Sequence, residues 1–201
     1  MAAVASTPCG VADAGQQSLR LHTLNGCRLA IGRFPAFRYD GRGGGGPGLS
    51  DTATGGTRRA LSFPPDSLSI PPLNSNTTRF LGLPLPPGLR ISIAAERLSG
   101  HWQPASGSIN LQFQARFRFR VTALGQVLYA PPDLQIACEL SSDGVQGRRH
   151  GTSGTPLSAD GHARLVGVAL VEPCGDAWLD RFLGLPDEAL AVLECRIETT
   201  P

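Results

Sequence analysis

Apolar and polar residues alternate without interruption from Ile109 to Val121. The odd positions are apolar, and the even positions carry asparagine, glutamine and arginine. This unbroken period of two predicts a β-strand with one face against a core and the other in water, typical of an antiparallel sheet. Residues 103–107 predict the preceding turn, so that Leu89–Trp102 becomes the partner strand.

Three more strands follow from shorter patterns. Leu134–Leu140 places alternate apolar residues, Cys138 among them, on one face. Residues 157–161 predict a turn into Leu165–Val171, which is apolar on both faces and therefore lies centrally in the sheet or beneath a helix. Ala36–Gly41 predicts a short strand with Phe37 and Tyr39 on one face.

Glycines mark the turns near the N-terminus. Asn25-Gly26 separates two apolar-polar runs, 18–24 and 27–31, and predicts a hairpin because both residues tolerate positive φ angles. A flexible loop is expected from Gly43 to about Gly56. Its glycines match the GxGxxG spacing of phosphate-binding loops, but Pro47 and polar residues follow instead of the required helix, so no phosphate site is predicted.

A hexapeptide, RFLGLP, occurs twice, at 79–84 and at 181–186. In the second copy Asp176 predicts a helix cap, residues 178, 179, 182 and 183 form one apolar helical face, and Gly184 predicts a left-handed stop. The repeat suggests two similar halves, about 18–100 and 101–201, after a disordered tail at 1–17. It has two interpretations: a packing unit used twice, or a binding site between the halves.

The predicted fold is therefore all-β: an antiparallel β-sandwich or flattened barrel with one or two short helices and an internal duplication. The composition agrees, because Gly (25) and Pro (17) are abundant among 201 residues and only 17% are charged. Residues 18–201 are expected to form a single domain.

The charges exclude several kinds of chemistry. All 18 basic residues are arginine, so a Schiff base, a lysine base and a phosphate-loop lysine are absent. A net charge of +2 is too small to predict a nucleic-acid partner. The five cysteines and four histidines show no metal-ligand spacing, and no cofactor or metal is predicted. Cys138 and Cys195 fall on apolar strand faces, which indicates reduced, buried thiols in a reducing compartment.

No catalytic residue can be assigned, because a nucleophile elbow is absent and the histidines are scattered. The candidate binding residues are a stripe of arginines on the long strand, a second pair in a Gly-rich loop, and one tryptophan: Arg116, Arg118, Arg120, Arg148, Arg149 and Trp102. The stripe predicts an anion or lipid surface, or an ordinary solvated face on which Glu96 offsets one charge. Trp102 forms either a pocket rim or the plug of a core end.

Three segments, Ile70–Leu73, Arg79–Gly88 and Leu183–Leu190, resemble uncharacterised conserved proteins of cyanobacteria, and the likeness covers roughly Phe37–Ile197. That resemblance implies a non-secreted protein of a photosynthetic cell and assigns no activity. The N-terminus lacks a secretory pattern, which predicts a cytoplasmic protein, with a plastid transit peptide as the alternative.

The function expected is non-catalytic binding or assembly, with a lipid, a pigment or a protein as partner. No apolar run is long enough for a transmembrane segment, while a peripheral membrane contact stays open. An enzyme site assembled from dispersed His, Asp and Arg residues is the alternative. An enclosed apolar pocket would favour binding, and converging titratable residues would favour catalysis.

Overall fold

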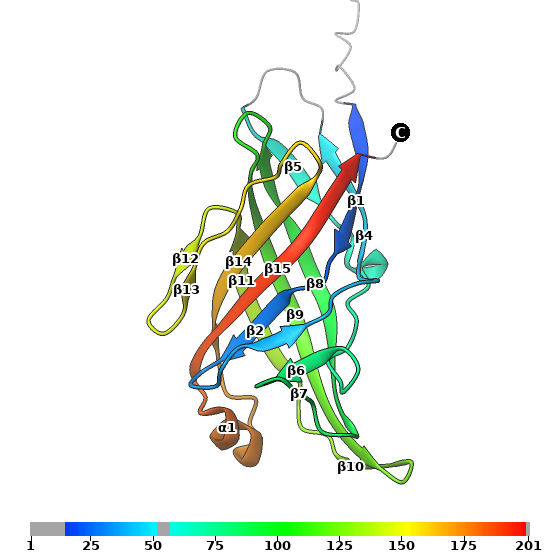
Figure 1. Ribbon diagram of the computed structural model, residues 1–201, viewed down its shortest axis with the longest axis vertical. Helices are drawn as coiled ribbons and strands as arrows, with labels where there is room; N and C mark the ends of the chain where they lie inside the picture. The colour runs from blue at the N-terminus through cyan, green and yellow to red at the C-terminus, as the bar shows by residue number, and fades with distance from the viewer. Residues whose placement is uncertain (1–14, 52–56, 200–201) are drawn as a thin grey trace, which may run out of the picture.

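The computed structural model describes residues 15–51 and 57–199, and nearly all of its regular structure is antiparallel β (Figure 1). The elements are β1 (Gln16–Thr23), β2 (Cys27–Ile31), β3 (Phe37–Tyr39), β4 (Gly45–Asp51), β5 (Arg59–Ser62), the 3-10 turn η1 (Pro65–Ser67), β6 (Thr78–Phe80), β7 (Leu83–Pro84), β8 (Leu89–Gln103), β9 (Ser108–Ala123), β10 (Gln126–Tyr129), β11 (Leu134–Ser141), β12 (Val145–Gln146), β13 (Gly151–Thr152), β14 (His162–Val171), α1 (Ala177–Leu183) and β15 (Asp187–Thr199). The predicted all-β class is confirmed.

The sheet closes on itself into a flattened barrel. Strands β1, β4, β5, β8, β9, β11, β14 and β15 pair in that order, and β15 pairs back with β1. We call the end of the barrel where β15 pairs with β1, at the top of Figure 1, the upper end. Toward the lower end, where α1 lies, β15 pairs instead with β2, and the sheet continues through β3, β6 and β7. A bridge between Leu73, in the segment before β6, and Ile91 of β8 connects that segment to the barrel.

The long hairpin predicted from the alternating pattern is confirmed. Strands β8 and β9 pair from Leu89↔Val121 to Gln103↔Ser108, with one register shift between Ala95 and Arg97. On β9, Ile109, Leu111 and Ala115 are fully buried, and the arginines of the same strand face out. The predicted strands at 36–41, 134–140 and 165–171 are also present as β3, β11 and β14.

Strand β14 lies centrally, as its two apolar faces predict. It pairs with β11 on one side and β15 on the other. Its inward side chains enter the barrel, while its outward face packs beneath the short hairpin β12–β13, which leaves Val166 fully buried. Both faces are therefore shielded from water along much of the strand.

The hairpin predicted at Asn25-Gly26 is wrong. Strands β1 and β2 do not pair with each other; both pair with β15, β1 along residues 195–199 and β2 along residues 189–192. At this dipeptide the chain passes from one segment of β15 to another without reversing its direction. Of the two residues, Gly26 alone has a positive φ, of 92°. A type I′ hairpin needs positive φ at both central residues.

The glycine-rich segment is not a loop either. Residues 45–51 form β4, which pairs with β1 and β5, while residues 52–56 lie outside the described residues. A Cβ on Gly45 would sit 1.9 Å from the carbonyl oxygen of Leu21, so the absent side chain is what lets the two strands approach. The predicted disordered tail overlaps β1 at Gln16 and Gln17, and its first 14 residues lie outside the description.

The two RFLGLP copies fold differently. Residues 79–84 form the β6–β7 hairpin, whereas 181–186 end helix α1. Both glycines have positive φ, 85° at Gly82 and 75° at Gly184, as predicted, but in different structures. The hexapeptides therefore do not mark equivalent units, and the division into two similar halves stays a prediction without their support.

Helix α1 begins and ends where expected. The Asp176 carboxylate accepts the Leu179 N–H at 2.8 Å, and Gly184 ends the helix in the left-handed conformation. The four residues of its predicted apolar face differ in burial, however: Leu179 and Leu183 are buried, while Trp178 and Phe182 are exposed. Among the described residues, no helix is both long and apolar enough to cross a membrane.

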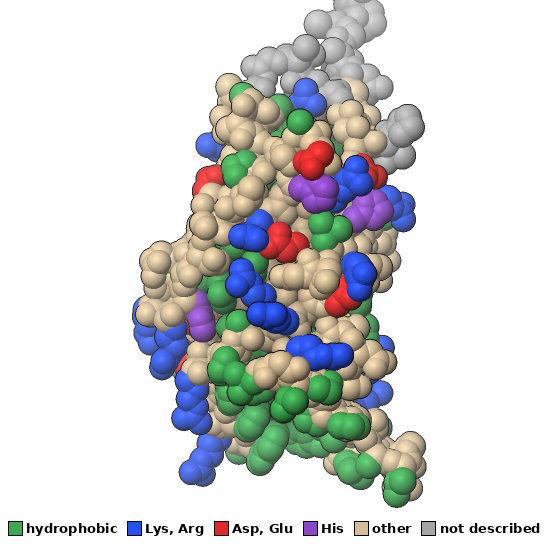
Figure 2. All heavy atoms as spheres, viewed as in Figure 1, with side chains coloured by type: hydrophobic (Ala, Val, Ile, Leu, Met, Phe, Trp, Pro, Cys, Tyr) green, Lys and Arg blue, Asp and Glu red, His purple; other side chains and the backbone are tan. Residues whose placement is uncertain are grey.

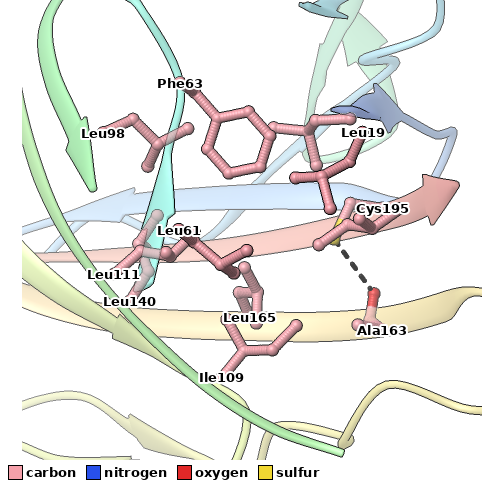
Figure 3. Close-up of a cluster of buried hydrophobic side chains, with 12 residues drawn as sticks. Leu19, Leu61, Phe63, Leu98, Ile109, Leu111, Leu140, Ala163, Leu165 and Cys195 are labelled. Carbon is pink, nitrogen blue, oxygen red and sulfur yellow. Dashed lines mark hydrogen bonds between the residues drawn. The ribbon is translucent and has the colours of Figure 1, made fainter. Parts of the chain in front are cut away.

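The upper half of the barrel is solidly filled. Figure 3 shows side chains from opposite walls meeting here, among them Phe63, Ile109 and Leu165, each 1% exposed or less. The Cys195 thiol lies in the same cluster and donates to the Ala163 carbonyl at 3.5 Å. We call this cluster the upper core.

Candidate apolar cavity

The lower half of the barrel contains a cavity of about 400 Å³ that is partly open to the surface. Its wall is contributed by β2, β3, β8, β9, β11, β14 and β15, together with the segment 68–73 and helix α1. This volume lies within the roughly 300–1,000 Å³ of ligand-binding pockets in proteins. The cavity is therefore large enough for a small organic molecule or for part of a longer chain.

The cavity exists because the two walls carry side chains of different size. The lining residues of β14 are small, Gly167 and Ala169, and they pair with Ala191 and Ala189 of β15, which also contributes the larger Leu190, Val192 and Leu193. The opposite wall carries large residues of β8 and β9, including Ile93 and Phe117. Protein interiors are normally close-packed, so a space of this size reflects small residues on one wall that the other does not fill.

Three of the polar side chains on the wall, those of Thr23, Tyr39 and Cys27, are turned toward the backbone; Ser69 also lines the cavity. Thr23 donates its hydroxyl to the Gly41 carbonyl, and the Tyr39 hydroxyl donates to the Pro71 carbonyl. The Cys27 thiol donates to the Leu24 carbonyl at 3.3 Å. Burial raises the pKa of Tyr39 above its ordinary value, so its phenol stays neutral. These groups are satisfied internally and leave the wall apolar.

Cys138 also faces the cavity, from β11. Burial raises the pKa of its thiol to about 11, and the more deeply buried Cys195 to about 12. A thiol with such a pKa carries almost no thiolate near neutral pH and behaves as a small apolar group. The four described cysteines are free, as predicted for the thiols at 138 and 195; Cys9 lies outside the described residues.

At the lower end an aromatic cluster surrounds the cavity. Trp178 stacks on Phe182 with centroids 5.2 Å apart, and Phe182 contacts Phe34 at 5.3 Å. Tyr129 meets Trp178 edge-on and donates its hydroxyl to Asp176 at 2.7 Å. Phe34 and Phe182 line the cavity, and Phe182 is 50% exposed, so the apolar wall continues to the surface at this end. Figure 2 shows hydrophobic side chains gathered there.

The predicted arginine stripe is largely neutralised. Arg116 pairs with Glu96 at 2.6 Å, which confirms the offset expected from that residue, and Arg118 pairs with Asp133 at 3.1 Å. Arg120 forms no ion pair among the described residues and lies opposite Arg90 on β8. All three point away from the cavity, so they do not contribute to its wall.

The second arginine pair fastens the β12–β13 hairpin to the barrel. The Glu188 carboxylate accepts the backbone N–H groups of Arg148 and Arg149, each at 2.7 Å, and the Arg149 guanidinium donates to Asp187 at 2.8 Å. Backbone N–H donors lower the pKa of Glu188, and the Glu188 N–H and Arg149 together lower that of Asp187. These arginines hold a surface hairpin in place.

Trp102 lies at the upper end, far from the cavity. It packs against the upper core, and the Arg59 guanidinium lies 5.5 Å from its ring centroid. Of its two predicted roles, the structure favours the plug of a core end.

The titratable residues needed for catalysis do not converge. No His, Arg, Asp or Glu is among the described residues that line the cavity. His162 pairs with Asp160 and His22 lies 3.8 Å from Glu198, both at the outer surface, while His150 contacts the Gly32 carbonyl. Asp180 accepts the backbone N–H groups of Cys174 and Gly175.

Residue patterns alone did not locate the cavity. The alternation on β9 identified its inward residues but gave no sign that some of them face empty space. A signal was available in β15, where alanines at 189 and 191 fall on the inward face of a strand otherwise rich in larger residues. Whether these alanines leave a cavity depends on which side chains face them across the barrel, and that is known only once the register of the strands around the barrel is known.

No family model, curated protein or solved structure matches this chain, so the cavity and its surroundings are the basis for any functional conclusion.

Proposed function

We propose that this protein is a non-catalytic binding protein that holds an apolar ligand, a lipid or a pigment, in the cavity of its barrel. The observation that carries the proposal is the cavity itself. It has a volume of about 400 Å³, and no charged residue is found among its described lining residues.

The chemistry of the wall favours an apolar ligand over a polar one. A buried polar ligand needs hydrogen-bonding partners, and an unpaired polar group in such a site is unfavourable by about 1–3 kcal/mol. The hydroxyls of Thr23 and Tyr39 already donate to backbone carbonyls. A hydrocarbon chain or a conjugated ring system makes no such demand and removes its own apolar surface from water.

The alternative, an enzyme with a site assembled from His, Asp and Arg residues, has less support. The four histidines lie outside the cavity wall, and three carboxylates near the lower end, Asp133, Asp176 and Asp180, are engaged with backbone N–H groups or an arginine. A ligand held among inert side chains is stored, carried or presented rather than converted.

The free thiols and the resemblance to cyanobacterial proteins support a setting for this activity. Reduced cysteines at 27, 138, 174 and 195 fit the proposed cytoplasmic location, or a plastid, better than an oxidising compartment. In a photosynthetic cell the candidate ligands include membrane lipids and pigments, both of which have long apolar portions.

A fluorescence titration with cis-parinaric acid, a polyene fatty acid that emits in apolar surroundings, tests the proposal. The wild type should bind it saturably. Ala169→Phe fills part of the cavity from the β14 wall and should weaken binding by at least about tenfold, the equivalent of about 1.4 kcal/mol. Leu170→Phe is the matched control, because Leu170 is the next residue on the same strand and faces solvent.

Absence of saturable binding, or equal binding by wild type and Ala169→Phe, would contradict the proposal. Native mass spectrometry of protein purified from its own host would identify a retained ligand by mass.

A further inference from the structure

We propose that the lower end of the barrel docks onto the surface of a lipid bilayer that carries anionic headgroups. The docking surface consists of three protruding segments: the β6–β7 turn, the β9–β10 turn and helix α1. It lies on the exterior, so the proposal goes beyond ligand binding and does not depend on the cavity being occupied.

Two leucines at the tips of this surface hold strained backbone conformations. Leu81 and Leu124 have φ angles of 51° and 50°, and they are the described non-glycine residues with positive φ. Each precedes a glycine in a two-residue turn, between Phe80↔Leu83 and between Ala123↔Gln126. Such turns favour asparagine, aspartate or glycine at the first position, because a branched apolar side chain resists this conformation.

These leucines gain nothing from the fold in return for the strain. Leu81 is 71% exposed and Leu124 is fully exposed, and Leu83 and Leu128 beside them are also exposed. An apolar side chain that is both strained and in water is unfavourable twice over. Burial in a hydrocarbon phase outside the chain would remove the free-energy cost of exposing these side chains to water.

The aromatic cluster has the character of an interfacial anchor. Trp178 is 61% exposed and stacks on Phe182, while Tyr129 keeps its hydroxyl on Asp176. Tryptophan and tyrosine favour the boundary between hydrocarbon and water because each combines an apolar ring with a polar group.

These segments come from distant parts of the sequence but meet at one end of the molecule. Figure 1 places α1 and β10 at the two sides of the bottom and β6–β7 above them in the lower half, and Figure 2 shows hydrophobic side chains over this part of the molecule. Phe182 belongs both to this surface and to the cavity wall. The cavity therefore opens where the bilayer would lie.

The charges around this end complement an anionic surface. Five arginines on the surrounding strands, turn and helix form no ion pair among the described residues: Arg33, Arg79, Arg90, Arg120 and Arg181. Arg90 and Arg120 lie directly opposite each other across β8 and β9, a repulsive arrangement that a phosphate between them would relieve.

The carboxylates nearby are mostly occupied. Asp133 pairs with Arg118, and Asp176 and Asp180 accept backbone N–H groups. Glu172, just after β14, is exposed and has no partner among the described residues. Asp176 and Asp180 keep their charges because their hydrogen-bond donors are neutral, so three carboxylates stand against the five arginines that form no ion pair. The local balance is positive.

The depth of the arginines favours a bilayer over a protein partner. Arg120 precedes Leu124 by four residues on β9, which runs along the long axis of the molecule (Figure 1), and this places it about 13 Å behind that tip in an extended strand. Arg79 precedes the Leu81 tip by two residues. Interfacial elements bury their apolar side by about 5–10 Å, so the arginines would stand at headgroup level while the leucines reach hydrocarbon.

Vesicle flotation tests the proposal, with phosphatidylcholine vesicles that contain or lack phosphatidylglycerol. The wild type should float with the anionic vesicles, less so with phosphatidylcholine alone, and less at high salt. The double variant Leu81→Asn/Leu124→Asn should weaken flotation by at least about tenfold, because two leucine side chains no longer enter hydrocarbon. Asparagine suits both turns, so this variant should fold at least as well as the wild type.

Matched controls separate docking from folding and from ligand binding. Leu49→Asn changes an exposed leucine at the upper end and should leave flotation unchanged. Arg90→Gln/Arg120→Gln should reduce the preference for phosphatidylglycerol. The chain has two tryptophans, so Trp102→Phe leaves Trp178 as the reporter, and its emission should shift to the blue with anionic vesicles.

Several results would overturn the proposal: no flotation with anionic vesicles, equal flotation of the asparagine variant, or an unchanged Trp178 spectrum. A dimer in sedimentation that the asparagine variant dissociates would assign this end to a second copy instead. Ala169→Phe should float normally and the asparagine variant should bind cis-parinaric acid normally, so failure of docking and failure of ligand binding are distinguishable.

Discussion

The upper and lower halves of the barrel are built from the same long strands yet have opposite interiors. On β9, Ile109 and Leu111 are completely buried in the upper core, whereas Phe117, farther along the same inward face, lines open space. On β14, Leu165 lies in the upper core and Ala169 on the cavity wall. An alternating pattern thus gives a strand its inward face, but the summed size of opposing side chains decides whether that interior is solid or hollow.

The exteriors differ as well. Ion pairs occur in the upper and middle parts, as between Arg164 and Glu194 at 2.6 Å and between Arg196 and Glu198 at 3.0 Å, and also near the lower end, where Arg118 pairs with Asp133. What distinguishes the lower end is that exposed leucines stand at its turns. The upper half stabilises the fold, and the lower half carries the features that a fold alone does not need.

Truncation of a large side chain should separate the two interiors most strongly. Leu165→Ala leaves a new void in the filled upper core and should lower the free energy of unfolding by about 2–5 kcal/mol. Ile93→Ala only enlarges an existing cavity and removes fewer contacts, so its effect should stay below about 2 kcal/mol. Urea unfolding would measure both losses in the free energy of unfolding, and equal m-values would show that the variants unfold in the same way as the wild type. Equal losses would mean that the lower half is packed as tightly as the upper.

Enlargement of a small side chain should give the converse result with a smaller effect. Ala163 and Ala169 share the inward face of β14, the first in the upper core and the second at the cavity. Ala163→Phe should overpack the core and destabilise the protein by about 1–3 kcal/mol, while Ala169→Phe should stay within about 1 kcal/mol of wild type. Thermal melts measure both changes in stability. A larger destabilisation by Ala169→Phe than by Ala163→Phe would contradict the presence of a cavity beside Ala169.

Acid should loosen the lower exterior locally before the barrel unfolds. The folded-state pKa values of Asp187 and Glu188 lie below their ordinary values, because both carboxylates accept N–H groups when the hairpin β12–β13 is docked. Their contribution is therefore present above the unfolded pKa values near about 4 and is lost as pH falls through the folded ones.

The protection factors of the Arg148 and Arg149 amides, which correct for the slower intrinsic exchange of amides in acid, should accordingly fall at acid pH, while amides of β9 stay protected. Glu188→Gln removes the titrating carboxylate and should give faster exchange already at neutral pH, with a weaker dependence on acid. A hairpin whose exchange does not respond to pH would show that these carboxylates do not hold it.

Several elements followed from local patterns because local physics alone fixes them. Period-two alternation specified β9 and β11, the turn at 103–107 placed β8 beside β9, and the cap at Asp176 with the stop at Gly184 specified α1. The Glu96 partner of Arg116 was also predictable, since neighbouring strands of a hairpin bring such residues together.

The errors arose where distant segments outweigh local preference. Asn25-Gly26 has the residues of a hairpin turn, but β15 pairs with the strands on both sides and keeps the chain extended past it. The glycines of 43–48 suggest a loop, but β1 and β5 supply hydrogen bonds, and the missing side chains let the strands approach closely. Six identical letters form a hairpin at 79 and a helix end at 181 because their neighbours differ.

The sequence by itself determined the β class, the inward faces of the long strands and the all-arginine surface, because each depends on residue type and period along one segment. The cavity, the convergence of Leu81, Leu124 and Trp178 at one end, and the pairing state of each arginine were decided only by the tertiary structure. Those properties depend on which residues from remote segments stand opposite one another, and strand registration around a closed barrel is a property of the whole chain.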